Sequence, residues 1–118
     1  MPWTYIKIHQ ALVLPLLLAG CFGGPPPGKG EKAEQGYNEA KPIIAALEKW
    51  RSHHGSYPNS IDELLPTYLE ILPTPNETYS YTYHITKESY ELWFKYTGPG
   101  MNVCAYSPED SWNCSGYL

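Results

Sequence analysis

The sequence predicts an α+β fold, in which one N-terminal amphipathic helix packs on a small antiparallel sheet of three to four strands. Apolar residues first recur at three- and four-residue intervals, and after Asn76 they alternate at every second residue. The first period is that of a helix with one buried face, and the second is that of half-buried strands. A chain of 118 residues has room for one domain with one small core.

Residues 1–20 have the features of a secretory signal peptide. Lys7 supplies a positive charge, an uncharged run covers residues 11–20, and small residues precede Cys21. We therefore predict cleavage before Cys21 and attachment of lipid, including palmitate, to its thiol. The predicted lipobox consists of Leu18, Ala19 and Gly20. The alternative is an ordinary cleavable signal followed by a chance cysteine, which would give a secreted domain without a lipid.

The expected location is the bacterial cell envelope. The ten-residue run before Cys21 covers only about half of a hydrocarbon core roughly 30 Å thick, which argues against a transmembrane anchor. Acyl chains on Cys21 would instead hold the protein on the membrane. The next residue is Phe22 rather than the aspartate that retains lipoproteins in the inner membrane of enteric-type bacteria, which favours the outer membrane, facing the periplasm.

Residues 21–36 are predicted to form a flexible tether between the lipid and the domain. Five glycines and three prolines lie within residues 22–36, and apolar side chains are almost absent. Such a segment buries too little surface to offset the entropy of ordering it. The globular domain is expected to comprise residues 37–118.

The helix is expected to end near His54, where Gly55 can adopt the left-handed conformation of a helix stop. Pro42 is tolerated in a first turn, so regular helix should begin close to residues 38–41, or else kink at Pro42. The apolar positions are Ala40, Ile43, Ile44, Leu47 and Trp50.

A second, short helix is predicted after Pro58. Ser60 and Glu63 form a capping-box pattern, which places this helix from Ile61 to about Leu65. The segment that follows should be irregular because it contains three prolines, Pro66, Pro73 and Pro75.

Period-two patterns then predict two pairs of antiparallel strands. A polar turn at residues 86–89 separates the first pair, and residues 107–110 separate the second. The predicted strands are residues 79–85, 90–96, 102–106 and 111–117.

Each strand of the second pair contains one cysteine, Cys104 and Cys114. In an exported chain, two cysteines across a turn predict a disulfide, which would stabilise the fold by roughly 2–3 kcal/mol. A redox-active pair usually has the Cys-x-x-Cys spacing, which is absent, and no histidine lies near enough in sequence to complete a zinc site.

Residues 43–64 resemble the region of the major pseudopilins of type II secretion systems where an amphipathic helix ends in the pattern Tyr-x-x-x-x-Gly-x-Tyr-Pro-x-Ser-x-x-x-Leu. Trp50 stands at the aromatic position, and the other matches are Gly55, Tyr57, Pro58, Ser60 and Leu64. The resemblance implies a pilin-type head with an antiparallel sheet. It does not extend to the hydrophobic N-terminal helix of pseudopilins, in whose place this chain has the predicted lipid and tether.

The same resemblance implies a candidate calcium site in the C-terminal loop, because family members can bind calcium there. Calcium takes six to eight oxygen ligands, and this turn offers carboxylates, a hydroxyl and an amide. The candidate ligands are Ser107, Glu109, Asp110 and Asn113. The alternative is a solvated acidic turn, and no other cofactor is expected.

Two functions from different classes are considered. A net charge of −4 argues against nucleic acid, and the chain lacks phosphate-binding loops and known catalytic motifs, so we expect a non-enzymatic protein without a small-molecule substrate. The first hypothesis is a protein-interaction or structural module of the envelope, linked to type II secretion or pilus machinery. The alternative is a glycan- or peptidoglycan-binding module, in which exposed Trp93, Trp112 and tyrosines would stack on sugars and line one groove.

Overall fold

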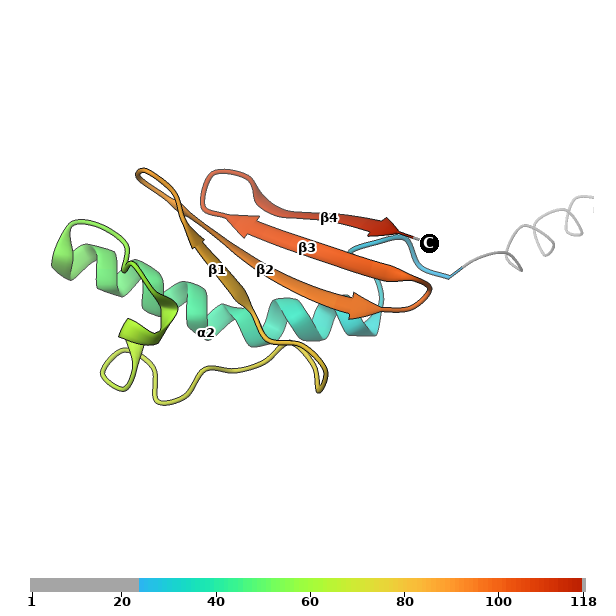
Figure 1. The fold of residues 1–118 in the computed structure, drawn as a ribbon, viewed down its shortest axis with the longest axis horizontal. Helices are drawn as coiled ribbons and strands as arrows, with labels where there is room; N and C mark the ends of the chain where they lie inside the picture. The colour runs from blue at the N-terminus through green and yellow to red at the C-terminus, as the bar shows by residue number, and fades with distance from the viewer. Residues whose placement is uncertain (1–23, 118) are drawn as a thin grey trace, which may run out of the picture.

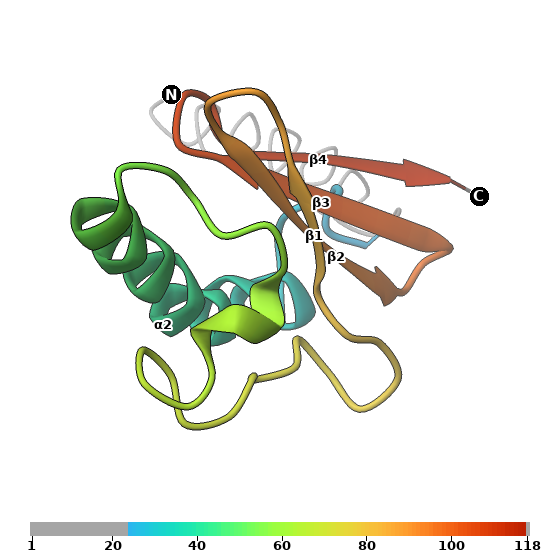
Figure 2. The ribbon, with the colours of Figure 1, turned by 60° about the vertical axis from the view of Figure 1, so that its left-hand side comes forward.

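The computed structural model describes residues 24–117, which form an α+β fold with one long helix and one antiparallel sheet (Figure 1). The sheet order is β1-β2-β3-β4, and each strand pairs antiparallel with its neighbour in the chain. Helix α2 covers one face of the sheet (Figure 2). The elements are α2 (Glu31–His54), the 3₁₀ helix η2 (Ile61–Leu64), β1 (Thr82–Ile85), β2 (Tyr90–Thr97), β3 (Met101–Ser107) and β4 (Ser111–Tyr117).

Helix α2 begins at Glu31, earlier than the predicted start at residues 38–41, and continues through Pro42. Pro42 is exposed, so the helix loses one hydrogen bond on its solvent side without burying an unpaired carbonyl. Its first turns are held in place because Ala33 is buried against the sheet. The predicted helix end is confirmed: Gly55 has φ 84° and its N–H donates to the carbonyl of Arg51 at 2.8 Å.

The predicted tether of residues 21–36 is wrong where the structure describes it, because residues 31–36 are helical and Gly28 is buried. The N–H of Gly28 donates to the Tyr96 hydroxyl at 2.8 Å, and the Tyr37 hydroxyl donates to the Gly28 carbonyl at 2.7 Å. Residues 24–30, called here the N-terminal segment, are thus fixed to the end of the sheet. Composition alone could not reveal these tertiary partners.

The larger of two hydrophobic clusters lies between the C-terminal half of α2, η2 and the start of β2. The predicted capping box forms, with Ser60 accepting from the N–H of Asp62 and the Glu63 carboxylate accepting from the N–H of Ser60. The box positions η2 so that Leu64 is fully buried. The larger cluster consists of Ala40, Ile43, Ala46, Leu47, Tyr57, Leu64, Tyr90 and Leu92.

The smaller cluster lies near the N-terminus of α2 and contains Ala33, Phe94, Tyr96 and Cys104. Cys104 and Cys114 face each other across β3 and β4 and form the predicted disulfide. Gly36 lies directly under the ring of Phe94, where even a methyl group would overlap it. A glycine inside the helix therefore brings α2 close to the sheet at this point.

The four strands match the predicted segments, except that β1 begins at Thr82 instead of residue 79. The N–H groups of Thr78 and Tyr79 donate to the Asn76 side chain, at 3.0 and 2.9 Å, and so are not available to a strand. The Asn76 amide also donates to the carbonyl of Lys95 at 2.8 Å. The Asn76 side chain thereby supplies a hydrogen-bond donor to a β2 carbonyl that lies beyond the end of the short β1 strand.

Candidate interaction surface

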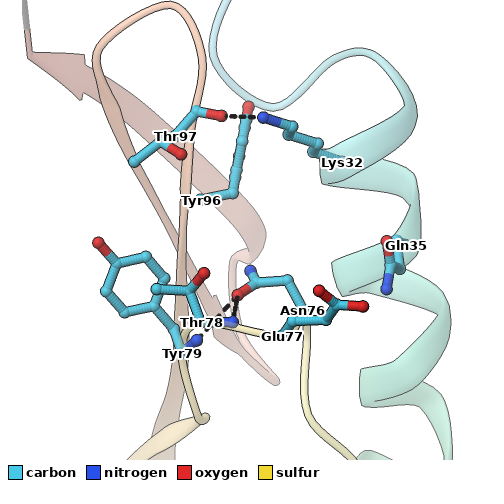
Figure 3. Close-up of a pocket in the computed structure, with 8 residues that line it drawn as sticks. All are labelled: Lys32, Gln35, Asn76, Glu77, Thr78, Tyr79, Tyr96 and Thr97. Atoms are coloured by element: carbon cyan, nitrogen blue, oxygen red, sulfur yellow. Dashed lines mark hydrogen bonds between the residues drawn. The ribbon is translucent and has the colours of Figure 1, made fainter.

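The hollow drawn in Figure 3 lies between α2, the loop before β1 and the end of β2, and has a volume of about 280 Å³. The Lys32 ammonium donates to the carbonyl of Thr97, and the Asn76 side chain is used by the backbone of residues 78, 79 and 95. These polar groups connect the helix and the loop to β2. The Lys32 ammonium and the Asn76 side chain are therefore already paired within the protein.

Two of the candidate calcium ligands take part in hydrogen bonds within the protein. The Ser89 hydroxyl donates to the Glu109 carboxylate, and its oxygen lies 2.9 and 2.7 Å from the two carboxylate oxygens. The Ser107 hydroxyl accepts from the backbone N–H of Asp110 at 3.1 Å. Asn113 lies on β4, where it is paired in register with Ala105. Within residues 24–117, no three histidine, cysteine, aspartate or glutamate side chains are grouped closely enough to hold a metal ion.

Trp93 and Trp112 lie on opposite faces of the sheet. Trp112 pairs in register with Tyr106 on the inner face, and its ring lies 4.9 Å from Tyr37 and 5.3 Å from Phe94. Trp93 points outward, away from α2, because it alternates with the buried Leu92 and Phe94 along β2. The two indoles therefore cannot line one glycan-binding groove.

The outer face of the sheet is not covered by any of the described helices (Figure 2). Strand register places Trp93, Ala105 and Asn113 in one row across β2, β3 and β4. The next two rows contain Lys95, Val103 and Ser115, and then Thr97, Met101 and Tyr117. Apart from Lys95, these rows are uncharged.

Trp93 is at the centre of this face and is held in one orientation. Its indole N–H donates to the Glu91 carboxylate at 3.2 Å, and the ring of His84 on β1 meets it edge-on at 5.8 Å. Trp93, Val103 and Ala105 are half-buried. They form an apolar patch that is bordered by uncharged side chains such as Asn113 and by the charged Glu91 and Lys95, and an apolar centre with a polar rim is typical of protein interfaces.

The outer face also adjoins a free strand edge. β4 is the last strand of the sheet, and no other described strand pairs with its outer edge. It is seven residues long, whereas β1 at the opposite edge has four. An edge of this length offers unpaired backbone groups to an added strand.

Comparison with protein-family models, curated proteins and solved structures gives no match. Among the described helices, none is long and apolar enough to span a bilayer. The predicted signal peptide, the lipobox and Cys21 lie outside the described residues.

Proposed function

We propose that this protein is a lipid-anchored envelope protein that binds another envelope protein through the outer face of its sheet. Cys21 would carry the anchor, and residues 24–117 would form a non-catalytic interaction module. The observation that carries the proposal is the outer face itself, which no described helix covers and which presents an apolar patch around Trp93.

Physical chemistry favours a protein partner over a small ligand at this face. Small ligands bind in concave sites that bury most of their area, whereas this face consists of rows of side chains on three neighbouring strands. A half-buried tryptophan with an orienting hydrogen bond is typical of the residues that dominate protein interfaces. The adjacent β4 edge would add backbone hydrogen bonds to the same contact.

The resemblance to pseudopilins suggests a component of a type II secretion or pilus assembly as the partner. Its motif residues form the helix stop and the capping box in this fold, and Tyr57 and Pro58 are buried. These residues stabilise the domain and do not themselves lie on the outer face. The identity of the partner must therefore come from an experiment on that face.

The test is site-specific photocrosslinking in membranes of the native host. A photoreactive phenylalanine analogue replaces Ala105, on the outer face, or Ala45, which is exposed on α2. We expect one recurrent envelope protein to be crosslinked from position 105 and not from position 45. Adding Trp93→Ala should reduce that crosslink at least several-fold.

Equal labelling from both positions, or none from position 105, would contradict an interface on the outer face. A partner that belongs to a secretion or pilus assembly would support the narrower proposal, and any other envelope protein would contradict it. Cys21→Ser, which removes the thiol for lipidation, should release the protein from membranes if the anchor is as proposed.

A further inference from the structure

The end of the domain nearest to Cys21 has an apolar surface of its own. A hollow of about 260 Å³ lies there, between the N-terminal segment, the turn that joins β2 and β3, and the end of β4. It is lined by uncharged residues: Pro25, Pro27, Pro99, Asn102, Gly116 and Tyr117. Tyr117 is 62% exposed, which is unusual for a large ring that has no charged neighbour in the lining.

The N-terminal segment is held rigidly over this end. The N–H and the carbonyl of Gly28 are each hydrogen-bonded to a tyrosine hydroxyl. Gly28 has φ 86° and leaves no room for a side chain, because a Cβ would lie 2.9 Å from the Cys114 sulfur. Gly116 likewise leaves the space that Pro27 occupies, and Gly24 lies against Pro99. The chain therefore enters the fold at a fixed place, beside the apolar hollow.

This arrangement limits the distance between the domain and a lipid on Cys21. Only three residue steps separate Cys21 from Gly24, which is at most about 11 Å of extended chain. The headgroup region is roughly 5–8 Å thick on each side of a bilayer. With its lipid inserted, the protein would thus have Gly24 at or just outside the headgroups.

The chemistry of this end suits a lipid surface. Prolines present no unpaired N–H groups, and tyrosine is enriched at the membrane interface because its ring is apolar and its hydroxyl is polar. Lys29 and Lys32 balance Glu31 and Glu34 in this part of the chain, so the end lacks the excess negative charge of the whole protein. The Lys32 ammonium donates to the carbonyl of Thr97 next to this turn, which connects the start of α2 to the same end of the sheet.

We propose that this end, formed by Pro25, Pro27, Pro99 and Tyr117, docks on the membrane surface and fixes the orientation of the domain. The inference rests on the proposed lipid anchor at Cys21. In this arrangement the domain does not rotate freely on a flexible linker, and its strands extend away from the membrane. The turn at residues 86–89, at the opposite end of β2 from residues 97–101, is then far from the lipid (Figure 1).

The test uses the mature lipidated protein on vesicles of phosphatidylethanolamine and phosphatidylglycerol. A spin-labelled unnatural amino acid is placed at Tyr117 or, as the matched control, at Ile85, which is 41% exposed at the opposite end of the sheet. We expect oxygen to relax the label at position 117 several-fold more than a water-soluble nickel complex does. At position 85 the nickel complex should be the better relaxant.

Flotation of the vesicles separates failure of the docking from failure of the anchor. A protein that floats but shows the same aqueous label at both positions would overturn the docking and leave the anchor intact. A label at position 117 that is shielded from both relaxants would indicate a protein contact and also overturn it. If the protein purified from the host has no lipid on Cys21 and does not float with the vesicles, both the lipid anchor and the docking would be overturned. Circular dichroism of each labelled protein would establish that the substitution leaves the fold intact.

Discussion

The two hydrophobic clusters of this domain are built by different physical means. The larger cluster joins apolar side chains of α2, η2 and β2, and most of its members follow one another at helical or strand periods. The smaller cluster has four buried residues and is completed by a disulfide, a helix glycine and two tyrosine hydroxyls bonded to the N-terminal segment. One cluster depends mainly on buried apolar area, and the other on specific links.

The difference shows how a small domain can extend its core where apolar side chains are few. At the smaller cluster, the Tyr37 hydroxyl reaches Gly28 and lies 3.2 Å from the Cys114 sulfur, so one phenol contacts both the segment and the disulfide. Each such link contributes modestly, whereas removal of buried hydrocarbon is costly. Substitutions in the two clusters should therefore differ in size.

The largest loss of stability is expected from Leu47→Ala in the larger cluster. Leu47 is fully buried, and its truncation should lower the free energy of unfolding by about 3 kcal/mol, through lost burial and a residual cavity. Urea unfolding followed by tryptophan fluorescence measures this. Leu72→Ala, at a half-buried loop position, is the matched control and should cost clearly less. Equal losses would mean that the larger cluster does not dominate stability.

Gly36→Ala should destabilise the domain by about 2 kcal/mol, although alanine is the better helix former. The added methyl group would overlap the ring of Phe94, so α2 must move away from the sheet. Thermal unfolding detects the loss. Gln35→Ala, one residue earlier on the exposed side of α2, should be nearly neutral. A stabilising effect of Gly36→Ala would show that helix and sheet are less closely packed here than described.

Tyr37→Phe should cost about 1 kcal/mol, because it removes the hydrogen bond to the Gly28 carbonyl and leaves that acceptor buried. Limited proteolysis within residues 24–30 should become faster. Tyr90→Phe is the matched control in the larger cluster: the Tyr90 hydroxyl is buried without a partner among the described residues, so its removal should cost nothing. If both substitutions had the same effect, the link between Tyr37 and Gly28 would have no special role.

The larger cluster and the sheet were largely predictable from the sequence, because periodicity, Gly55 and the capping box are local signals. The disulfide was predicted from the two cysteines that follow Cys21. The smaller cluster was not predictable in the same way, since a segment rich in glycine and proline normally indicates a linker. Its order comes from Tyr37, Tyr96 and Gly36, whose partners are distant in sequence.

For the candidate interaction surface, the sequence predicted an aromatic strand pair but not which ring would face solvent. Trp93 alternates with the buried Leu92 along β2, whereas Trp112 is paired in register with Tyr106 on the inner face, so the two indoles lie on opposite faces. The predicted lipobox, in contrast, is a local sequence signal and lies outside the described residues. Strand register is therefore the information that sequence patterns lacked.

The smallest predicted change in the free energy of unfolding near neutral pH comes from the ionisation of two tyrosines. Tyr57 belongs to the larger cluster, and Tyr83 packs against it. Burial, followed by the hydrogen bond to Glu48 at 2.7 Å, raises the pKa of Tyr57 to about 12, and burial together with Glu63 raises the pKa of Tyr83 to about 12. In the unfolded chain both should titrate near 10, so the folded state binds more protons between about pH 10 and 12.

The free energy of unfolding should therefore not depend on these two tyrosines below about pH 9, and it should fall as the pH rises from about 10 towards 12. Urea unfolding at a series of alkaline pH values measures the slope. Tyr57→Phe removes one of the hydroxyls whose pKa is raised in the folded state, so it should make the slope shallower, and adding Tyr83→Phe should reduce it again. A slope that is the same in all three proteins would show that alkaline unfolding begins elsewhere, which would make the smaller cluster the first part of the domain to be examined.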